Sequence, residues 1–121
     1  MVHPMGKLTT HVLDTAQGLP GAGVELTLYR NVAERYVFVQ AAVTNADGRC
    51  DAPLLEGAAL TAGRYRLVFQ AGAYFAARGV PLPDPPFVDQ VVLDFGIADV
   101  DAHYHVPLLV SPWSYATYRG S

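Results

Sequence analysis

The sequence predicts an all-β protein, a two-sheet β-sandwich of about seven to eight short strands with one short helix. Stretches in which apolar and polar residues alternate recur along the chain, and this alternation is the period of a strand with one buried face. Turn signals separate these stretches, the strongest being Asn45-Ala46-Asp47-Gly48. Residues 72–79 alone have the character of a helix, alanine-rich and closed by a glycine. Many short strands with frequent turns favour a sandwich.

The first half of the chain predicts three strands. They are residues 7–13, 24–30 and 36–43. In the first strand, alternation places two sets of side chains on opposite faces: Leu8, Thr10 and Val12 against Thr9, His11 and Leu13. Residues 14–21 are expected to form a turn, because glycine and proline supply its backbone angles. Arg49 directly follows the Asp47-Gly48 turn and is expected at its lip.

The second half predicts strands at residues 64–69 and 87–95 and two closing strands around a Ser-Pro-Trp-Ser turn. In the first closing strand, Tyr104, Val106, Leu108 and Val110 alternate with His105, Pro107 and Leu109. The first set is expected to face the core, and the second set a surface that a subunit or ligand must cover. Four prolines between residues 81 and 86 predict an extended connector, since proline cannot donate to a strand ladder.

Composition bounds the class of protein. The chain has 121 residues, enough for one domain with a real core. It is 51% hydrophobic and 16% charged, which is typical of a globular protein. A formal net charge of −3 argues against a nucleic-acid or anionic-membrane partner. The single cysteine, Cys50, excludes an intrachain disulfide, and no signal-peptide or membrane-length apolar run is seen, so a cytoplasmic protein is expected.

His11 and His105 are the main candidates for chemistry. A single histidine on a strand is most often simply half-exposed. Both of these lie on faces too apolar to remain in water, which indicates that something packs there. An imidazole in such a cleft can act as general base or acid near neutral pH. Arg49 and Arg119 have plainer interpretations, a solvated loop cation and an edge-strand charge.

His103 and His105 form a His-x-His pair that could bind zinc together with His11. No carboxylate accompanies them at a fixed spacing, so the zinc hypothesis is the weaker one. Cys50 is interpreted as a small, buried residue rather than a nucleophile. Ser114 and Ser121 lack the Gly-x-Ser-x-Gly context of a serine hydrolase.

Four segments together resemble the enzyme branch of the transthyretin family, the 5-hydroxyisourate hydrolases. They are Leu8-Thr9-Thr10-His11-Val12-Leu13-Asp14, Gly48-Arg49, His105-Val106-Pro107-Leu108-Leu109 and Tyr118-Arg119-Gly120-Ser121. The resemblance covers residues 7–121 as a single domain and leaves residues 1–6 as an unmatched leader. The hormone-carrier branch lacks the closing tetrapeptide and replaces both histidines and the arginine.

The resemblance implies a transthyretin-like sandwich that assembles as a homotetramer around a channel. The residues expected on the channel side are Thr9, His11, Leu13, His105, Pro107, Leu109, Ala116, Tyr118 and Gly120. The implied reaction is hydrolysis of the cyclic amide of 5-hydroxyisourate to 2-oxo-4-hydroxy-4-carboxy-5-ureidoimidazoline in urate degradation, without metal or organic cofactor.

The implied roles divide the site residues into two groups. His11, Arg49 and His105 would be catalytic, and the substrate-binding residues would be Tyr118, Arg119, Gly120 and Ser121. The alternative from another class is a carrier that binds a small aromatic ligand in the same channel.

Overall fold

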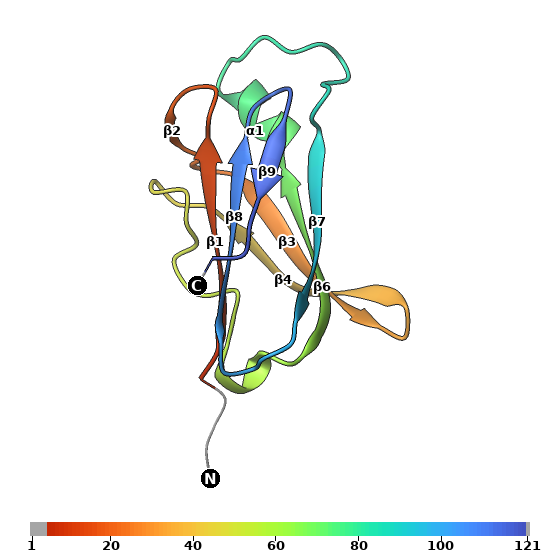
Figure 1. The fold of residues 1–121 in the computed structure, drawn as a ribbon. Coiled ribbons are helices and arrows are strands. Elements are labelled where there is room, and N and C mark those ends of the chain that lie inside the picture. The colour runs from red at the N-terminus through yellow and green to blue at the C-terminus, as the bar shows by residue number, and fades with distance from the viewer. Residues whose placement is uncertain (1–4, 121) are drawn as a thin grey trace.

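The strands form two sheets that face each other. The computed structural model describes residues 5–120 (Figure 1). One sheet has the order β2-β1-β8-β9, with β5 beside β1, and the other has the order β4-β3-β6-β7. The strands are β1 (Lys7–Asp14), β2 (Leu19–Pro20), β3 (Glu25–Val32), β4 (Arg35–Val43), β5 (Leu55–Glu56), β6 (Gly63–Gln70), β7 (Gln90–Ile97), β8 (His103–Val110) and β9 (Tyr115–Thr117). The helices are a 3-10 turn, η1 (Gly57–Ala59), and α1 (Ala71–Ala77).

The predicted fold class is confirmed, with two small differences among the turns. Residues 14–21, expected as a turn, contain the two-residue strand β2, which pairs with the end of β1. The strand predicted at residues 64–69 is β6, which begins one residue earlier at Gly63 and follows the 3-10 turn η1. Among the described residues, no helix has the length and apolar character needed to cross a membrane.

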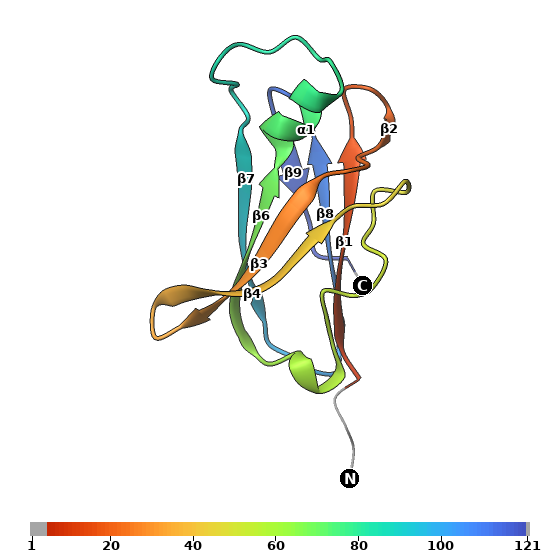
Figure 2. The same ribbon diagram turned by 180° about the vertical axis from the view of Figure 1, so that it is seen from behind.

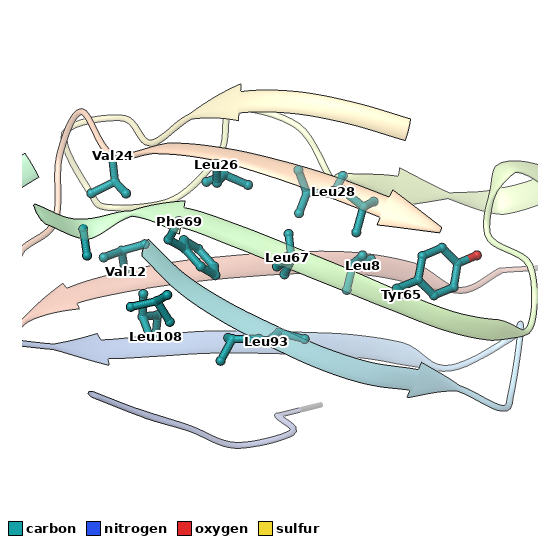
Figure 3. Packing of buried hydrophobic residues seen from close by; sticks show 14 of the residues in the cluster. Leu8, Val12, Val24, Leu26, Leu28, Tyr65, Leu67, Phe69, Leu93 and Leu108 are labelled. Atoms are coloured by element: carbon teal, nitrogen blue, oxygen red, sulfur yellow. The ribbon is translucent and has the colours of Figure 1, made fainter. Parts of the chain in front are cut away.

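The core lies between the sheets and follows the predicted alternation. Leu8 and Val12 of β1 are fully buried, and Figure 3 shows them facing Leu67 and Phe69 of β6. The intervening side chains of β1, which point away from the core, are only half-buried. Each fully buried aliphatic side chain contributes about 1.5–3 kcal/mol of transfer free energy. The burial therefore fixes the register of β1 and, with it, which face carries His11.

The strands that carry the two candidate histidines are neighbours. β1 and β8 pair in parallel along their whole lengths, with Thr9 opposite His105 and His11 opposite Pro107. Parallel neighbours need a long crossover, and here the crossover includes the entire second sheet (Figure 2). The two ends of the sequence thus meet on one face of one sheet.

One strand predicted from the sequence was misplaced at both ends. The strand expected at residues 87–95 begins only at Gln90 and continues to Ile97. Pro85 and Pro86 precede it, and Phe87 is 73% exposed, so the extended connector continues past the prolines. The predicted helix is confirmed as α1. It begins at Ala71, one residue before the expected start, and ends at Ala77, two residues before the expected end.

Candidate active site

β1 and β8 bring His11 and His105 together on the face of their sheet that points away from the core. Their ring centroids are 6.5 Å apart. The ring of His103 lies 6.1 Å from that of His105 on the same side of β8. All three side chains are half-buried in the single chain. The structure therefore gathers three imidazoles, contributed by residues from opposite ends of the sequence.

Arg49 reaches the same site because a tight turn brings its backbone to β1. Asn45 organises this turn: its Oδ1 accepts the N–H groups of Asp47 at 2.9 Å and Arg49 at 3.1 Å. His11 and Arg49 form an isolated antiparallel bridge. Nε2 of His11 lies 2.9 Å from the carbonyl oxygen of Asp47. The predicted Asn-Ala-Asp-Gly turn is thus the element that places Arg49 beside His11.

Gly48 is required in this turn for two separate reasons. Its φ of +77° lies in the left-handed region that favours glycine. A Cβ at this position would also lie 2.3 Å from the carbonyl oxygen of Val12. The Gly48 carbonyl oxygen accepts the N–H of Val12 at 2.7 Å, so the turn is bonded directly to β1.

A recess of about 370 Å³ opens beside the imidazoles. It is lined by Thr9, Thr10, Arg49, Cys50, Ala52, His103 and His105. Thr9 connects two of the rings, because its Oγ1 lies 2.7 Å from Nε2 of His103 and 2.8 Å from Nδ1 of His105. His11 adjoins the recess through its ring contact with His105 and is not part of the lining.

The environment of His103 and His105 favours their neutral forms. Burial lowers the pKa of His105 below its ordinary value of 6.5, and the positive charges of Arg49, His103 and His11 lower it further. Burial also lowers the pKa of His103, assisted by Lys7 and Arg119. A neutral imidazole has a free lone pair on one nitrogen and can accept a proton from water.

Cys50 has the opposite character to a nucleophile. Burial raises the pKa of its thiol, and the neighbouring Asp51 raises it further. The thiolate that would attack a substrate is therefore disfavoured near neutral pH. Cys50 lines the recess as a small apolar side chain.

The closing tetrapeptide divides between two places. The N–H of Gly120 donates to the carbonyl oxygen of His105 at 2.7 Å, and the N–H of His105 donates back to Gly120 at 3.3 Å. Tyr118 and Arg119 instead line a separate recess against Phe95 and Tyr104, and the Arg119 guanidinium lies 4.5 Å from the centre of the Tyr104 ring. Ser121 lies outside the described residues.

The structure thus brings together His11, Arg49, His105 and Gly120. It also adds Thr9, which sequence reasoning placed on the correct face of β1 but gave no role. The spacing that could have indicated Thr9 was its position two residues from His11. What the sequence did not contain was the register that sets Thr9 opposite His105.

The zinc hypothesis finds no support in residues 5–120. No three His, Cys, Asp or Glu side chains in this part of the chain are placed to hold a metal. One ring nitrogen of each histidine has another partner: Thr9 lies within hydrogen-bond distance of Nε2 of His103 and Nδ1 of His105, and the Asp47 carbonyl oxygen within that of Nε2 of His11.

Comparison with known proteins places the chain in a family. Residues 8–120 match the model of the HIUase/Transthyretin family. The chain belongs to this family. It is 62% identical over 117 residues to a protein of Ralstonia nicotianae named 5-hydroxyisourate hydrolase, a match that covers 97% of this chain and all of that protein. The prediction that the chain is an enzyme of the hydrolase class is confirmed by relatives of this kind.

The chain is similar to two solved structures that differ in length and in name. A crystal structure of (S)-allantoin synthase matches with a TM-score of 0.92 and 48% identity, covering 97% of this chain, which spans only 44% of that longer protein. Sea bream transthyretin, solved in complex with thyroxine, matches with a TM-score of 0.85 and 28% identity, with 94% of each chain covered. The sandwich is therefore common to a longer protein named as a synthase and to a transthyretin solved with thyroxine.

Proposed function

We propose that this protein hydrolyses the cyclic amide of 5-hydroxyisourate to 2-oxo-4-hydroxy-4-carboxy-5-ureidoimidazoline, a step in urate degradation. The observation that carries the proposal is the meeting of two imidazoles and a guanidinium at one recess. Seven relatives named 5-hydroxyisourate hydrolase, at 50–62% identity, support the same substrate.

The reaction needs a base for water, positive charge at the developing oxyanion and an acid for the leaving nitrogen. One of His11 and His105 removes a proton from water as its oxygen attacks the ring carbonyl. Arg49 donates N–H groups to the oxygen that becomes negative. When the intermediate opens, the C–N bond breaks and the imidazolium returns its proton to the nitrogen. Every proton is accounted for by the substrate, one water and one imidazole.

Substrate binding is assigned to the chain end, Tyr118, Arg119, Gly120 and Ser121. Gly120 supports this directly, because its backbone runs along His105 and its missing side chain leaves the imidazole room. Tyr118 and Arg119 contact a different recess in the single chain. Their assignment therefore rests on the family resemblance and on a contribution in the assembled protein.

The site is proposed to be completed in a homotetramer. Arg49 is exposed in the single chain, and the half-buried Leu13 and Leu109 pair on the outward face of β1 and β8 beside it. Apolar side chains on the same outward face as the histidines indicate a surface that another subunit covers. Covering this face would exclude water and strengthen the interaction between Arg49 and the oxyanion. The one cysteine, unpaired, fits the reducing cytoplasm.

A carrier is the second candidate function, because the sea bream relative was solved with thyroxine bound. A carrier needs a shaped apolar channel and no base. The lowered pKa of His105 and the position of Arg49 are unexplained in a carrier and are required in a hydrolase. The two functions therefore differ in what happens to a bound ligand.

The test is to mix the purified protein with freshly generated 5-hydroxyisourate and follow the ultraviolet absorbance against a blank without protein. Hydrolysis predicts decay faster than the blank, with repeated turnover at low protein concentration. Arg49→Lys should lower the rate, since lysine cannot provide the two-pronged donor. Arg64→Lys, on an exposed residue of β6, is the matched control and should retain the rate.

Decay equal to the blank would overturn the proposal. Saturable binding of the substrate or of an aromatic anion without decay would favour the carrier instead. A rate for Arg49→Lys equal to that of Arg64→Lys would remove the assigned role of Arg49 while leaving the activity in place.

A further inference from the structure

Thr9 occupies a position that the proposed chemistry does not yet use. Its hydroxyl oxygen lies between two imidazole nitrogens, Nε2 of His103 and Nδ1 of His105, at 2.7 and 2.8 Å. Both distances are short for hydrogen bonds that involve nitrogen. Thr9 is opposite His105 in the parallel register of β1 and β8, so the backbone fixes this contact.

A hydroxyl group limits how the two rings can share it. Threonine has one proton to donate and two lone pairs to accept with. If both contacts are hydrogen bonds between neutral groups, at most one nitrogen can accept the single hydroxyl proton, so at least one of the two rings donates its own N–H to Thr9. The tautomers of His103 and His105 are therefore coupled through Thr9.

Three arrangements satisfy this rule, and His105 can act as a base through Nε2 only in the two in which its Nδ1–H donates to Thr9. In one of these two, Thr9 in turn donates to Nε2 of His103, and in the other His103 also donates to Thr9. Nε2 of His105 carries a free lone pair in both. In the third arrangement Thr9 donates to Nδ1 of His105, Nε2 of His105 bears the hydrogen, and Nε2 cannot accept a proton from water.

His11 is placed differently. Its Nε2 lies 2.9 Å from the carbonyl oxygen of Asp47, and a carbonyl can only accept, so Nε2 carries the hydrogen. No second side chain among the described residues couples its ring in the way that Thr9 couples His103 to His105. A base oriented by a third group is the recurring arrangement in hydrolytic sites, and here His105 has that support.

We propose that Thr9 is a positioning residue that accepts the Nδ1–H of His105 and so holds His105 as the base, with His103 fixing the Thr9 hydroxyl from the other side. This inference rests on the proposed function and assigns the choice between the two histidines. Neither Thr9 nor His103 exchanges a proton with the substrate. Both act through His105.

The charges around the three residues fit this arrangement. His105 faces Arg49 from the loop, His11 from β1 and His103 from its own strand, and His103 faces Lys7 and Arg119. All these neighbours are cationic or can become so, and they lower the pKa of both imidazoles after burial does. A neutral His103 can accept the Thr9 proton, which turns the Thr9 lone pair towards His105.

The experiment compares Thr9→Val, Thr9→Ser and wild type in two measurements. Valine keeps the β-branched shape and removes the hydroxyl, and serine keeps the hydroxyl. Thr9→Val should lower kcat about 10- to 100-fold with little change in KM, part of the 10²–10⁴ that a positioned base contributes. The acid limb of its pH profile should move to lower pH, because the imidazolium loses its acceptor. Thr9→Ser should restore most of kcat and the original limb.

The second measurement reads the tautomer directly from the imidazole ¹⁵N chemical shifts. In wild type, neutral His105 should carry its hydrogen on Nδ1, and Thr9→Val should shift the population towards Nε2–H. This readout needs no substrate. Thr15→Val is the matched control, because it too loses a hydroxyl hydrogen bond, in this case one of 3.2 Å to the carbonyl oxygen of Val110. It should leave kcat and the His105 shifts unchanged.

The outcomes separate this inference from the proposed function. Wild-type kcat in Thr9→Val, or His105 with its hydrogen on Nε2 in wild type, would overturn the inference even if the enzyme is active. An inactive wild type would overturn the function, and the chemical shifts would still decide the hydrogen-bond chain. If Thr9→Val does not fold, His103→Phe removes the acceptor from β8 instead and should lower kcat in the same direction. Unchanged kcat there would also contradict the inference.

Discussion

At the scale of single residues, Gly120 shows how closely the chain end is fitted to His105. A Cβ on Gly120 would lie 3.2 Å from both Cβ and Cδ2 of His105. The imidazole would have to move by a few tenths of an ångström to accept it. Because its position relative to Thr9 is already fixed by a 2.8 Å contact, such a movement disturbs the geometry of the base.

Gly120→Ala should therefore lower kcat with little effect on the melting temperature. Displacement of a catalytic group by less than 1 Å can cost up to about 10²-fold in rate. The control is Gly96→Ala, where the nearest atom to an added Cβ is 4.0 Å away, and its kcat should match wild type. Equal kcat for the two variants would contradict the fit described for Gly120.

The lowered pKa of His105 predicts the pH dependence of the reaction. The base must be neutral, so kcat/KM is retained as pH falls below 6.5 and declines only when pH passes the lowered pKa. Burial is the larger cause, and the charges of Arg49, His103 and His11 come after it. High salt screens only the charges, so it should raise the acid limb part of the way towards 6.5.

The measurement is the pH profile of kcat/KM at low and high ionic strength. An acid limb at or above 6.5 in low salt would contradict the assigned environment of His105. The same shift has a consequence for folding. The unfolded chain binds a proton on this histidine at higher pH than the native state, so its contribution to stability is lost as pH falls from 6.5 through the lowered pKa.

Sequence reasoning reached His11, Arg49 and His105 through the family resemblance, and strand alternation placed both histidines on the outward face. It missed Thr9 because a hydroxyl on a strand has no signal of its own. Its role depends on which residue lies across the ladder, and the pairing of β1 with β8 spans almost the whole sequence. His103 was considered as a metal ligand, whereas the structure places it beside Thr9.

At the scale of elements, the hairpin between β3 and β4 carries local strain. Val32 pairs with Arg35, so the loop contains only Ala33 and Glu34. Their φ values are +50° and +65°, which suit a two-residue hairpin turn but are unfavourable for residues with a side chain. The sequence there has no glycine or proline to indicate a turn, and none was predicted.

Replacing the loop by Ala33→Asn with Glu34→Gly should stabilise the protein by about 1–2 kcal/mol, because Asn-Gly accepts positive φ at both positions. The gain should appear in the free energy of unfolding from denaturant titration, with kcat unchanged. Glu25→Gly is the control, because it introduces a glycine on the extended backbone of β3, where positive φ is not needed. It should lower the free energy of unfolding by about 0.5–1 kcal/mol. Destabilisation by the loop variant would contradict the hairpin conformation.

Most elements could be predicted from their own residues, and the exceptions have local causes. The alternation of β1, β3, β6 and β8 was clear because each has a buried face, whereas β4 has no fully buried side chain. The start of β7 was misplaced because Phe87 looks like a strand residue, whereas the prolines before it hold the chain away from the sheet. No local pattern distinguishes a parallel from an antiparallel neighbour, so the order of the strands required the whole structure.

At the scale of the whole molecule, the single chain leaves the candidate site open to solvent. Arg49 is exposed and the recess opens directly to the surface. The fold class and family could be predicted because the matching segments span the chain from Leu8 to Gly120. The assembly could not be predicted in the same way. In the single chain, its only sign is the uncovered outward face of β1 and β8.

Activity should therefore depend on assembly. Specific activity should fall on dilution at the concentration where sedimentation shows the oligomer dissociating into single chains. Varying the salt concentration at a fixed protein concentration separates this effect from the screening of Arg49 by salt. Full specific activity in a solution of single chains would contradict a site completed by partners.

His105→Asn tests whether His105 supplies the base in a site where His11 and Arg49 converge. The asparagine amide can keep the contact that Nδ1 makes with Thr9 but has no atom in place of Nε2. We expect turnover of 5-hydroxyisourate, followed by ultraviolet decay, to fall by about 10²–10⁴ while the oligomer in sedimentation stays as in wild type. Turnover of the variant at the wild-type rate would contradict the account.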